Sequence, residues 1–281
     1  MNIYEVGPRD GLQNCSVNLK TIEKIKMVED LHRAGLKNIE VTSFVHPKRV
    51  PQLADAEIVF EETRHLGDLD VLIPNRKGYE RAKNVGAKNL NVFFSHSDEF
   101  NFRNLGKTFD EAFPDIQNML VEESKENVRA YVSCAFGCPF EYGMPDETKL
   151  KNVIQKADEI ADTVVLCDTI GAAYPSKMLR ILNLTRGIDA EVALHLHENK
   201  NGVNDIFTNV KSAVEWGITN FDSSIAGLGG CPFIPDSGNN LSTNQLINWA
   251  NNNGYETGIE LDNLAGVTDF ILRETKLKLI A

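Results

Sequence analysis

The alternation of strand-like and helix-like segments is the feature that most constrains the fold of this chain. Short apolar segments typical of buried strands recur along the sequence, and amphipathic segments with helical spacing lie between them. We expect strands at residues 2–6, 38–44, 70–74, 89–95, 128–136, 163–168, 191–197 and 220–227. Helical segments include residues 19–35, 147–161 and 202–217. Such alternation produces parallel strands joined by right-handed crossovers.

Eight strands and about eight helices in roughly 230 residues predict an α/β fold of the (β/α)8, or TIM-barrel, type. Gly35, Gly86 and Gly217 each end a helical segment, as glycines commonly do. A doubly wound open sheet is the alternative, but neither a GxGxxG motif nor a Walker loop follows the first strand. We expect one catalytic domain over residues 1–281, with the barrel at about 2–250 and additional C-terminal helices at about 252–281.

Composition and charge narrow the functional class. The chain is 42% hydrophobic and 25% charged, which is ordinary for a globular protein. Its net charge of −11 argues against a nucleic-acid partner. No apolar run approaches the roughly 18 residues that span a bilayer, and the N-terminal segment lacks the pattern of a signal peptide. We therefore expect a cytoplasmic protein that does not bind membranes.

The cysteines indicate neither disulfides nor zinc. There are five of them, an odd number in a long chain, which argues against a secreted disulfide framework. Cys134 and Cys138 do not have CxxC spacing, and no second pair accompanies them, so a zinc knuckle is not expected. We expect four of the five, Cys15, Cys134, Cys138 and Cys167, to pack in the interior or line a pocket.

Two histidines at the end of the seventh predicted strand indicate a metal site. His195 and His197 are spaced by two, so on a strand they project from the same face. Two neutral imidazoles supply half of a divalent-metal site. The alternative is that hydrogen bonds hold both histidines in the barrel without a metal. Asp10, directly after the first strand, adds a carboxylate if the barrel closes.

Other polar residues fall where a TIM barrel places its active site, at the carboxyl ends of strands and in the loops that follow. These residues are Arg9, Asp10, Asp168, Cys231 and Asn240, and Glu40 lies within the second predicted strand. Because the first and eighth strands are neighbours in a closed barrel, Asp10, both histidines and Asn240 can share one centre. This mixed oxygen and nitrogen set suits Mg²⁺ or Mn²⁺ better than a closed zinc site. Asn239 is an alternative ligand to Asn240.

Two further residues have reactive side chains. Cys231 lies in the glycine-rich segment GLGGCPF, where a thiol can donate or accept a proton; the alternative is a buried, inert cysteine. Arg9 can hold an oxygen on which negative charge develops, or form an ion pair with Glu40, and the two roles are compatible. The basic stretches at residues 46–52 and 74–83 could bind an anionic group or simply be solvated helix starts.

Several segments together resemble one enzyme family, 3-hydroxy-3-methylglutaryl-CoA (HMG-CoA) lyase. They are EVGPRDGLQN, VTSFVHPKRVPQLADA, PNRKGYERA, YVSCAFGCPFE, DTIGAAYP, HLH and GLGGCPF, and the resemblance extends from about residue 3 to 245. Related aldolases and Claisen-type synthases share the RDG and HxH elements, but they lack the combination of the two cysteine-containing segments YVSCAFGCP and GLGGCP. The resemblance implies a metal-dependent TIM barrel that cleaves its substrate into acetyl-CoA and acetoacetate.

The resemblance also implies residue roles. Metal ligands would be Asp10, His195, His197 and Asn240; substrate or coenzyme A would contact Arg9, Gln13, Asn75 and Lys77. Arg9 would stabilise the thioester enolate, Cys231 would act as acid or base, and Glu40 would support Arg9. The initial base could be His195, Asp10 or a water. By analogy with the family we expect a homodimer.

Three functional alternatives follow. The enzyme could cleave a related 3-hydroxyacyl-CoA, or it could be an aldolase or Claisen-type enzyme that acts on a 2-oxo acid. A non-catalytic barrel that binds a metal or coenzyme A is disfavoured, because all the reactive residue types are present.

Overall fold

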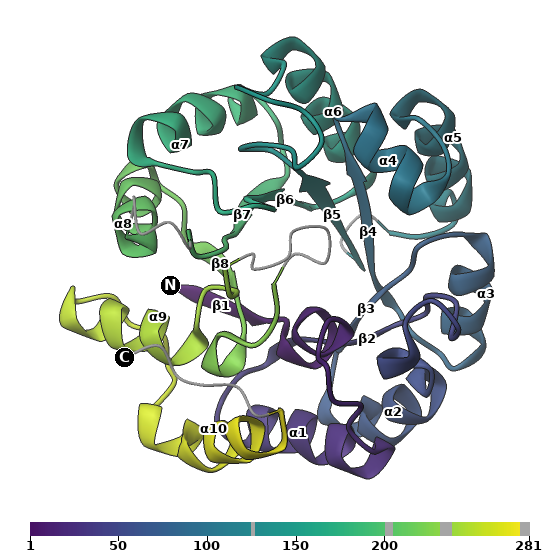
Figure 1. Cartoon of the computed structure of the whole chain (residues 1–281). Coiled ribbons are helices and arrows are strands. Elements are labelled where there is room, and N and C mark those ends of the chain that lie inside the picture. Colours follow the sequence, from purple (N-terminus) through teal and green to yellow (C-terminus); the bar gives the residue numbers. More distant parts are fainter. Residues whose placement is uncertain (125–126, 200–204, 231–237, 276–281) are drawn as a thin grey trace.

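The computed structural model describes residues 1–124, 127–199, 205–230 and 238–275. Eight parallel strands form a closed barrel in the order β1 to β8, with helices arranged around it (Figure 1). The strands are β1 (Asn2–Glu5), β2 (Asn38–Ser43), β3 (Asp70–Leu72), β4 (Asn89–Ser95), β5 (Val128–Ser133), β6 (Thr163–Cys167), β7 (Glu191–His195) and β8 (Asn220–Ser223). The predicted TIM-barrel fold is therefore confirmed.

The barrel closes between its first and last strands. β1 pairs in parallel with β8, with Asn2 opposite Asn220 and Glu5 opposite Ser223. This pairing places the segment after β1 beside the segments after β7 and β8, as the metal-site hypothesis requires.

Ten α-helices are present among the described residues. They are α1 (Thr21–Arg33), α2 (Ala56–Thr63), α3 (Arg76–Asn84), α4 (Asp98–Leu105), α5 (Phe109–Leu120), α6 (Glu147–Ile160), α7 (Pro175–Leu182), α8 (Ile206–Trp216), α9 (Thr243–Asn252) and α10 (Leu261–Thr275). Both α4 and α5 lie between β4 and β5, whereas α10 follows the last barrel unit and packs against α1 and α9.

Local sequence signals explain where several helices begin and end. Asp146 caps α6 by accepting hydrogen bonds from the amides of Thr148 and Lys149. Gly217 ends α8 with φ of 121°, a conformation that side chains other than glycine rarely adopt. Gly35 and Gly86 have positive φ after α1 and α3 in the same way.

Several strands end earlier than the sequence predicts, because the chain turns out of the sheet once its active-site loops begin. The apolar pattern extends β5 to residue 136, but the strand ends before Cys134, which has φ of 62°. β8 ends at Ser223, and Ile225–Gly227 forms a short 3₁₀ helix. β7 ends at His195, so the prediction that both histidines lie on a strand is wrong for His197, which instead bridges to Asn240.

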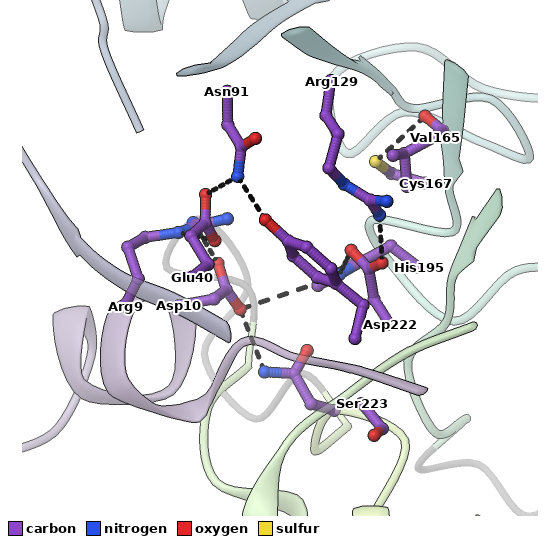
Figure 2. A network of polar contacts seen from close by, with 12 residues as sticks. Arg9, Asp10, Glu40, Asn91, Arg129, Val165, Cys167, His195, Asp222 and Ser223 are labelled. Carbon is purple, nitrogen blue, oxygen red and sulfur yellow. Dashed lines mark hydrogen bonds and ion pairs between the residues drawn. The ribbon is translucent and has the colours of Figure 1, made fainter. Parts of the chain in front are cut away.

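The apolar core of the described residues consists of three clusters, of which the smallest contains Phe100, Cys134 and Cys138. The large apolar cluster lies between the barrel and its helices and includes Ile39, Leu90 and Val164. Inside the barrel a smaller cluster of Tyr131, Val165, Cys167 and Ala193 is accompanied by buried polar residues. Those buried residues are Tyr4, Glu40, Asn91, His195 and Asp222, and the largely buried Arg129 joins them through Asp222. Figure 2 shows Glu40, Asn91, Arg129, His195 and Asp222.

The cysteines and the helices agree with the expectations from composition. Cys15, Cys134, Cys138 and Cys167 are buried free thiols, as predicted. Cys231 lies outside the described residues. No described helix combines the length and apolar character needed to cross a membrane.

Candidate metal centre

A single tight turn presents Asp10 to the barrel mouth. The segment after β1 forms one π-helical turn, Gly7–Gly11, in which the amides of Arg9, Asp10 and Gly11 all point to the carbonyl of Val6. Every residue of the turn is buried. The PRDG motif is thus a fixed structural element that aims the Asp10 carboxylate at the centre of the barrel.

Asp10, His195 and His197 meet, as predicted. One ligand atom from each of these three buried residues lies within 4.8 Å of the other two. The imidazole centroids are 5.0 Å apart, and Nε2 of His195 is 3.9 Å from Oδ2 of Asp10. A carboxylate and two imidazoles at this spacing form a set of ligands that suits one divalent cation.

Hydrogen bonds orient both imidazoles toward the centre. Nδ1 of His195 lies 3.3 Å from Oδ2 of Asp222, and Nδ1 of His197 lies 3.0 Å from the carbonyl oxygen of Asp168. Protons on both Nδ1 atoms satisfy these acceptors and leave each Nε2 lone pair free. This arrangement is how proteins commonly orient metal-binding histidines.

Asn240 provides an oxygen that fits the same centre. Its Nδ2 donates to Oδ2 of Asp10 and to the carbonyl of Leu228, both over 2.9 Å. Its Oδ1 is buried and has no hydrogen-bond partner among the described residues. A buried oxygen without a partner is costly, and a cation would compensate it. For Asn239 the described hydrogen bond is a backbone one, in which its carbonyl accepts from the amide of Glu198.

Close packing against Asn240 explains why one residue of the preceding glycine-rich segment is a glycine. Gly229 has φ of 109°, and a Cβ at this position would lie 2.5 Å from Nδ2 of Asn240. Only glycine allows the loop to pass this close to the asparagine.

Burial and neighbouring charges shift the pKa values of the three clustered residues in different directions. Burial alone raises the pKa of Asp10, but Arg9 and the two histidines outweigh burial and lower it. Burial and the neighbouring His195 lower the pKa of His197 to about 4. Burial also lowers the pKa of His195, but the hydrogen bond to Asp222 and the charge of Asp10 outweigh this effect and raise it. Without a cation, the centre therefore holds Asp10 as a carboxylate and His197 as a neutral imidazole.

Arg9 is fixed between two carboxylates beside the centre. Its Nε donates to Oε2 of Glu40, and its Nη1 donates to Oδ1 of Asp10 over 2.6 Å. Glu40 is fully buried and also accepts from Nδ2 of Asn91 over 2.8 Å. The ion pair with Glu40, one of the two roles considered for Arg9, is therefore present, and together the two carboxylates engage Nε and Nη1 of the guanidinium (Figure 2).

A cavity of about 160 Å³ opens directly above these groups. Its wall combines the polar centre with apolar and aromatic side chains. The lining residues are Arg9, Asp10, Gln13, Leu72, Phe93, Phe100, Asn104, Tyr131, Ser133, Cys167, Thr169, His195, His197 and Gly230. Small-molecule sites commonly have this composition.

The structure brings together some of the remaining predicted residues and not others. Gln13 lines the cavity and donates from Nε2 to Oδ1 of Asp10 over 3.0 Å. Asn75 and Lys77 are exposed and are not part of the lining; Asn75 caps α3 by accepting from the amide of Gly78. Asp168 acts on the centre through its backbone, since its side chain accepts from the amides of Ala172 and Ala173.

Sequence reasoning missed the polar residues inside the barrel. Asp222 orients His195, Arg129 pairs with Asp222, and Asn91 links Glu40 to the hydroxyl of Tyr4. Each lies within a strand rather than after one, so a search of strand ends does not find it. These residues could have been found by searching for charged or amide side chains inside strands that are otherwise apolar.

Comparison with known proteins gives a consistent result. The family model described as HMGL-like matches residues 1–271. The Bacillus subtilis hydroxymethylglutaryl-CoA lyase YngG is 36% identical, with 96% of this chain and 92% of that protein covered. The human mitochondrial hydroxymethylglutaryl-CoA lyase is 36% identical, with 99% and 86% covered.

Two solved structures extend the similarity to three dimensions. The crystal structure of the Bacillus subtilis HMG-CoA lyase has a TM-score of 0.91 and 34% identity, with 100% of this chain and 95% of that chain covered. An HMG-CoA lyase from Acinetobacter baumannii, in complex with coenzyme A and 3-methylmalate, has a TM-score of 0.90 and 33% identity, with 100% and 93% covered. The chain therefore belongs to the HMGL-like family.

Proposed function

We propose that this protein is a divalent-metal-dependent carbon–carbon lyase that cleaves 3-hydroxy-3-methylglutaryl-CoA into acetyl-CoA and acetoacetate. The observation that carries the proposal is the meeting of Asp10, His195 and His197 beside Arg9 at the base of a cavity. The relatives named as lyases cover nearly the whole chain, which supports the same reaction class.

Asp10, His195, His197 and Asn240 would hold the cation, which we propose to be Mg²⁺ or Mn²⁺. Their donor atoms are carboxylate and amide oxygens with imidazole nitrogens, a set that suits either ion. When bound, the cation would polarise the substrate oxygens and lower the pKa of the tertiary hydroxyl.

Different side chains around the centre would accept the hydroxyl proton and stabilise the negative charge that develops. The tertiary hydroxyl loses its proton to His195, to Asp10 or to a water beside them. Its oxygen then forms the ketone of acetoacetate as the adjacent carbon–carbon bond breaks. The electron pair of that bond passes to the thioester, giving an enolate. Arg9, held by Glu40 and Asp10, would stabilise the enolate oxygen electrostatically.

A proton donor is then needed at the enolate carbon. We assign this role to Cys231, following the family resemblance, since its thiol can donate the proton that converts the enolate into acetyl-CoA. Cys231 lies outside the described residues, so its role depends on the variant test in the Discussion.

The coenzyme A portion would leave the cavity across the barrel mouth. Gln13 lines the cavity and would contact the substrate, while the exposed Asn75 and Lys77 at the start of α3 are proposed to contact coenzyme A. The coenzyme A complex of the Acinetobacter baumannii lyase supports a ligand that carries coenzyme A. We further propose that residues 1–281 act as one catalytic domain and that the protein is a homodimer.

Incubation with 3-hydroxy-3-methylglutaryl-CoA and Mg²⁺ or Mn²⁺ tests the proposal directly. We expect acetoacetate and acetyl-CoA in equal amounts, and no product after chelation of the metal. A parallel incubation with oxaloacetate tests the aldolase alternative. Turnover of oxaloacetate without cleavage of any acyl-CoA would overturn the proposed substrate class.

A further inference from the structure

A charged residue lies where a TIM barrel usually has aliphatic side chains. Arg129 projects from β5 into the barrel interior, and only 13% of its side chain is exposed. Its guanidinium carbon lies 3.7 Å from the ring centroid of Tyr4. Barrel interiors are filled mainly by valine, isoleucine and leucine, and burial of a charge is costly unless the charge is compensated. The presence of Arg129 at this place therefore requires an explanation.

Arg129 shares a carboxylate with a residue of the metal centre. Its Nη2 donates to Oδ1 of Asp222 over 2.6 Å, while Oδ2 of Asp222 lies 3.3 Å from Nδ1 of His195. The Asp222 side chain is fully buried. His195 and Asp222 are also register partners on the neighbouring strands β7 and β8 (Figure 2).

This arrangement gives each oxygen of Asp222 a separate task. With Oδ1 held by Arg129, rotation of the carboxylate is restricted and Oδ2 stays directed at His195. The positive charge of Arg129 also compensates a carboxylate that water does not reach. A proton on Nδ1 of His195 is then favoured, which leaves Nε2 as the atom that faces Asp10.

A purely structural role explains these contacts less well. The Nε atom of Arg129 is buried and has no hydrogen-bond partner among the described residues. An arginine placed only to tie β5 to β8 would gain most from a two-pronged contact with the carboxylate. Here its hydrogen bond goes to one oxygen of Asp222, and the second oxygen is kept for His195.

We infer that Arg129 is a positioning residue that acts on the metal centre through Asp222, by fixing the carboxylate that orients His195. The inference rests on the metal site proposed above. Groups that orient metal-binding histidines typically change metal affinity by about 10- to 100-fold when they are removed.

The first test is the dissociation constant of Mn²⁺ for the full-length protein, measured by isothermal titration calorimetry. We expect Arg129→Gln to weaken Mn²⁺ binding by about 10-fold or more, and Arg129→Lys to weaken it less because the charge is kept. Lys24→Gln is a matched control, because Lys24 forms a buried ion pair with Asp55 outside the barrel interior. The control should bind Mn²⁺ like wild type.

A double-mutant cycle separates the inferred path from a general disturbance of the barrel. If Arg129 acts through Asp222, Arg129→Gln should weaken Mn²⁺ binding in the wild-type background and have little further effect in Asp222→Asn. An equal loss in both backgrounds would overturn the inference, as would unchanged binding by Arg129→Gln.

A measurement on the wild-type protein covers the case in which the variants do not fold. Nitrogen-15 spectra of Mg²⁺-loaded protein should show His195 protonated at Nδ1, and the opposite tautomer would contradict the inference. Absence of Mn²⁺ binding by wild type would instead refute the proposed metal site, so the two failures are distinguishable.

Discussion

Asn240 donates a hydrogen bond from Nδ2 to Oδ2 of Asp10 over 2.9 Å, although 230 positions separate the two residues in the sequence. The contact exists because β1 pairs with β8, which brings the loops after the first and last strands together. The same closure places Asp10 beside His195 and His197, and Asn240 bridges to His197.

The two asparagines of this loop should differ in their effect on metal binding. We expect Asn240→Ala to weaken Mn²⁺ binding by roughly 10- to 100-fold, because it removes the buried Oδ1 that has no described partner. Asn239→Ala is the matched control and should bind Mn²⁺ normally, since only its backbone forms a described contact. Calorimetric titration of both variants with Mn²⁺ tests which asparagine is the ligand. Weaker Mn²⁺ binding by Asn239→Ala than by Asn240→Ala would assign the ligand to Asn239.

Removal of one imidazole should abolish stable metal retention. We expect His197→Ala to lose its bound metal on dialysis, because His197 supplies one of the three clustered ligand atoms. Metal content by atomic emission is the measurement, with the exposed His65→Ala as control. Metal content equal to wild type would exclude His197 as a ligand.

Arg9 should affect the chemical step more than substrate binding. We expect Arg9→Gln to reduce kcat by about 10²- to 10³-fold, the usual loss when a group that stabilises a developing oxyanion is removed. The KM for the acyl-CoA should change much less. Arg33→Gln, at an exposed arginine paired with Asp30, serves as control. A rise in KM without a fall in kcat would contradict the proposed role.

Cys231 should be needed for turnover but not for metal binding. We expect Cys231→Ser to lower kcat by about 10²-fold or more, because a serine hydroxyl is a much weaker acid than a thiol. Metal content should remain that of wild type. Cys15→Ser is the comparison variant and should stay active; loss of metal from Cys231→Ser would argue for a structural role instead.

Glu5 should make stability depend on pH. Burial raises its pKa from 4.5 to about 7, against the hydrogen bonds from Thr243, Ile225 and Gly7. The folded state thus binds this proton more tightly, so the contribution of Glu5 to stability is greatest below pH 4.5 and declines as the pH rises to about 7.

The variant Glu5→Gln removes that titration. Between about pH 4.5 and 8 we expect the free energy of unfolding of wild type to fall relative to Glu5→Gln by about 3 kcal/mol. Urea denaturation across this range measures the difference, and other carboxyl groups cancel in the comparison. A constant difference between the two proteins would show that Glu5 titrates normally.

The fold and the meeting of Asp10, His195 and His197 were predictable because both follow from periodic patterns. Eight alternating units indicate the barrel, and barrel closure then requires Asp10 to approach His195. The spacing of His195 and His197 correctly placed both on the centre, although His197 lies beyond the end of β7.

The interior network was not predictable in the same way. Asn91, Arg129 and Asp222 lie on three different strands, and their pairing depends on register across the barrel rather than on spacing along the chain. The sequence pattern also overestimates the length of β7 and β8, since apolar residues continue into the loops after the sheet hydrogen bonds have ended.

The pairing of β1 with β8 also has a consequence for synthesis on the ribosome. Asp10 is synthesised early, but its hydrogen bond with Asn240 can form only after a further 230 residues have been added. Until β8 is made, β1 and β7 have open edges that can pair with other chains. Capture of a cation by all four proposed ligands therefore requires translation at least as far as Asn240, and we expect nascent chains stalled before β8 to be prone to aggregation and inactive.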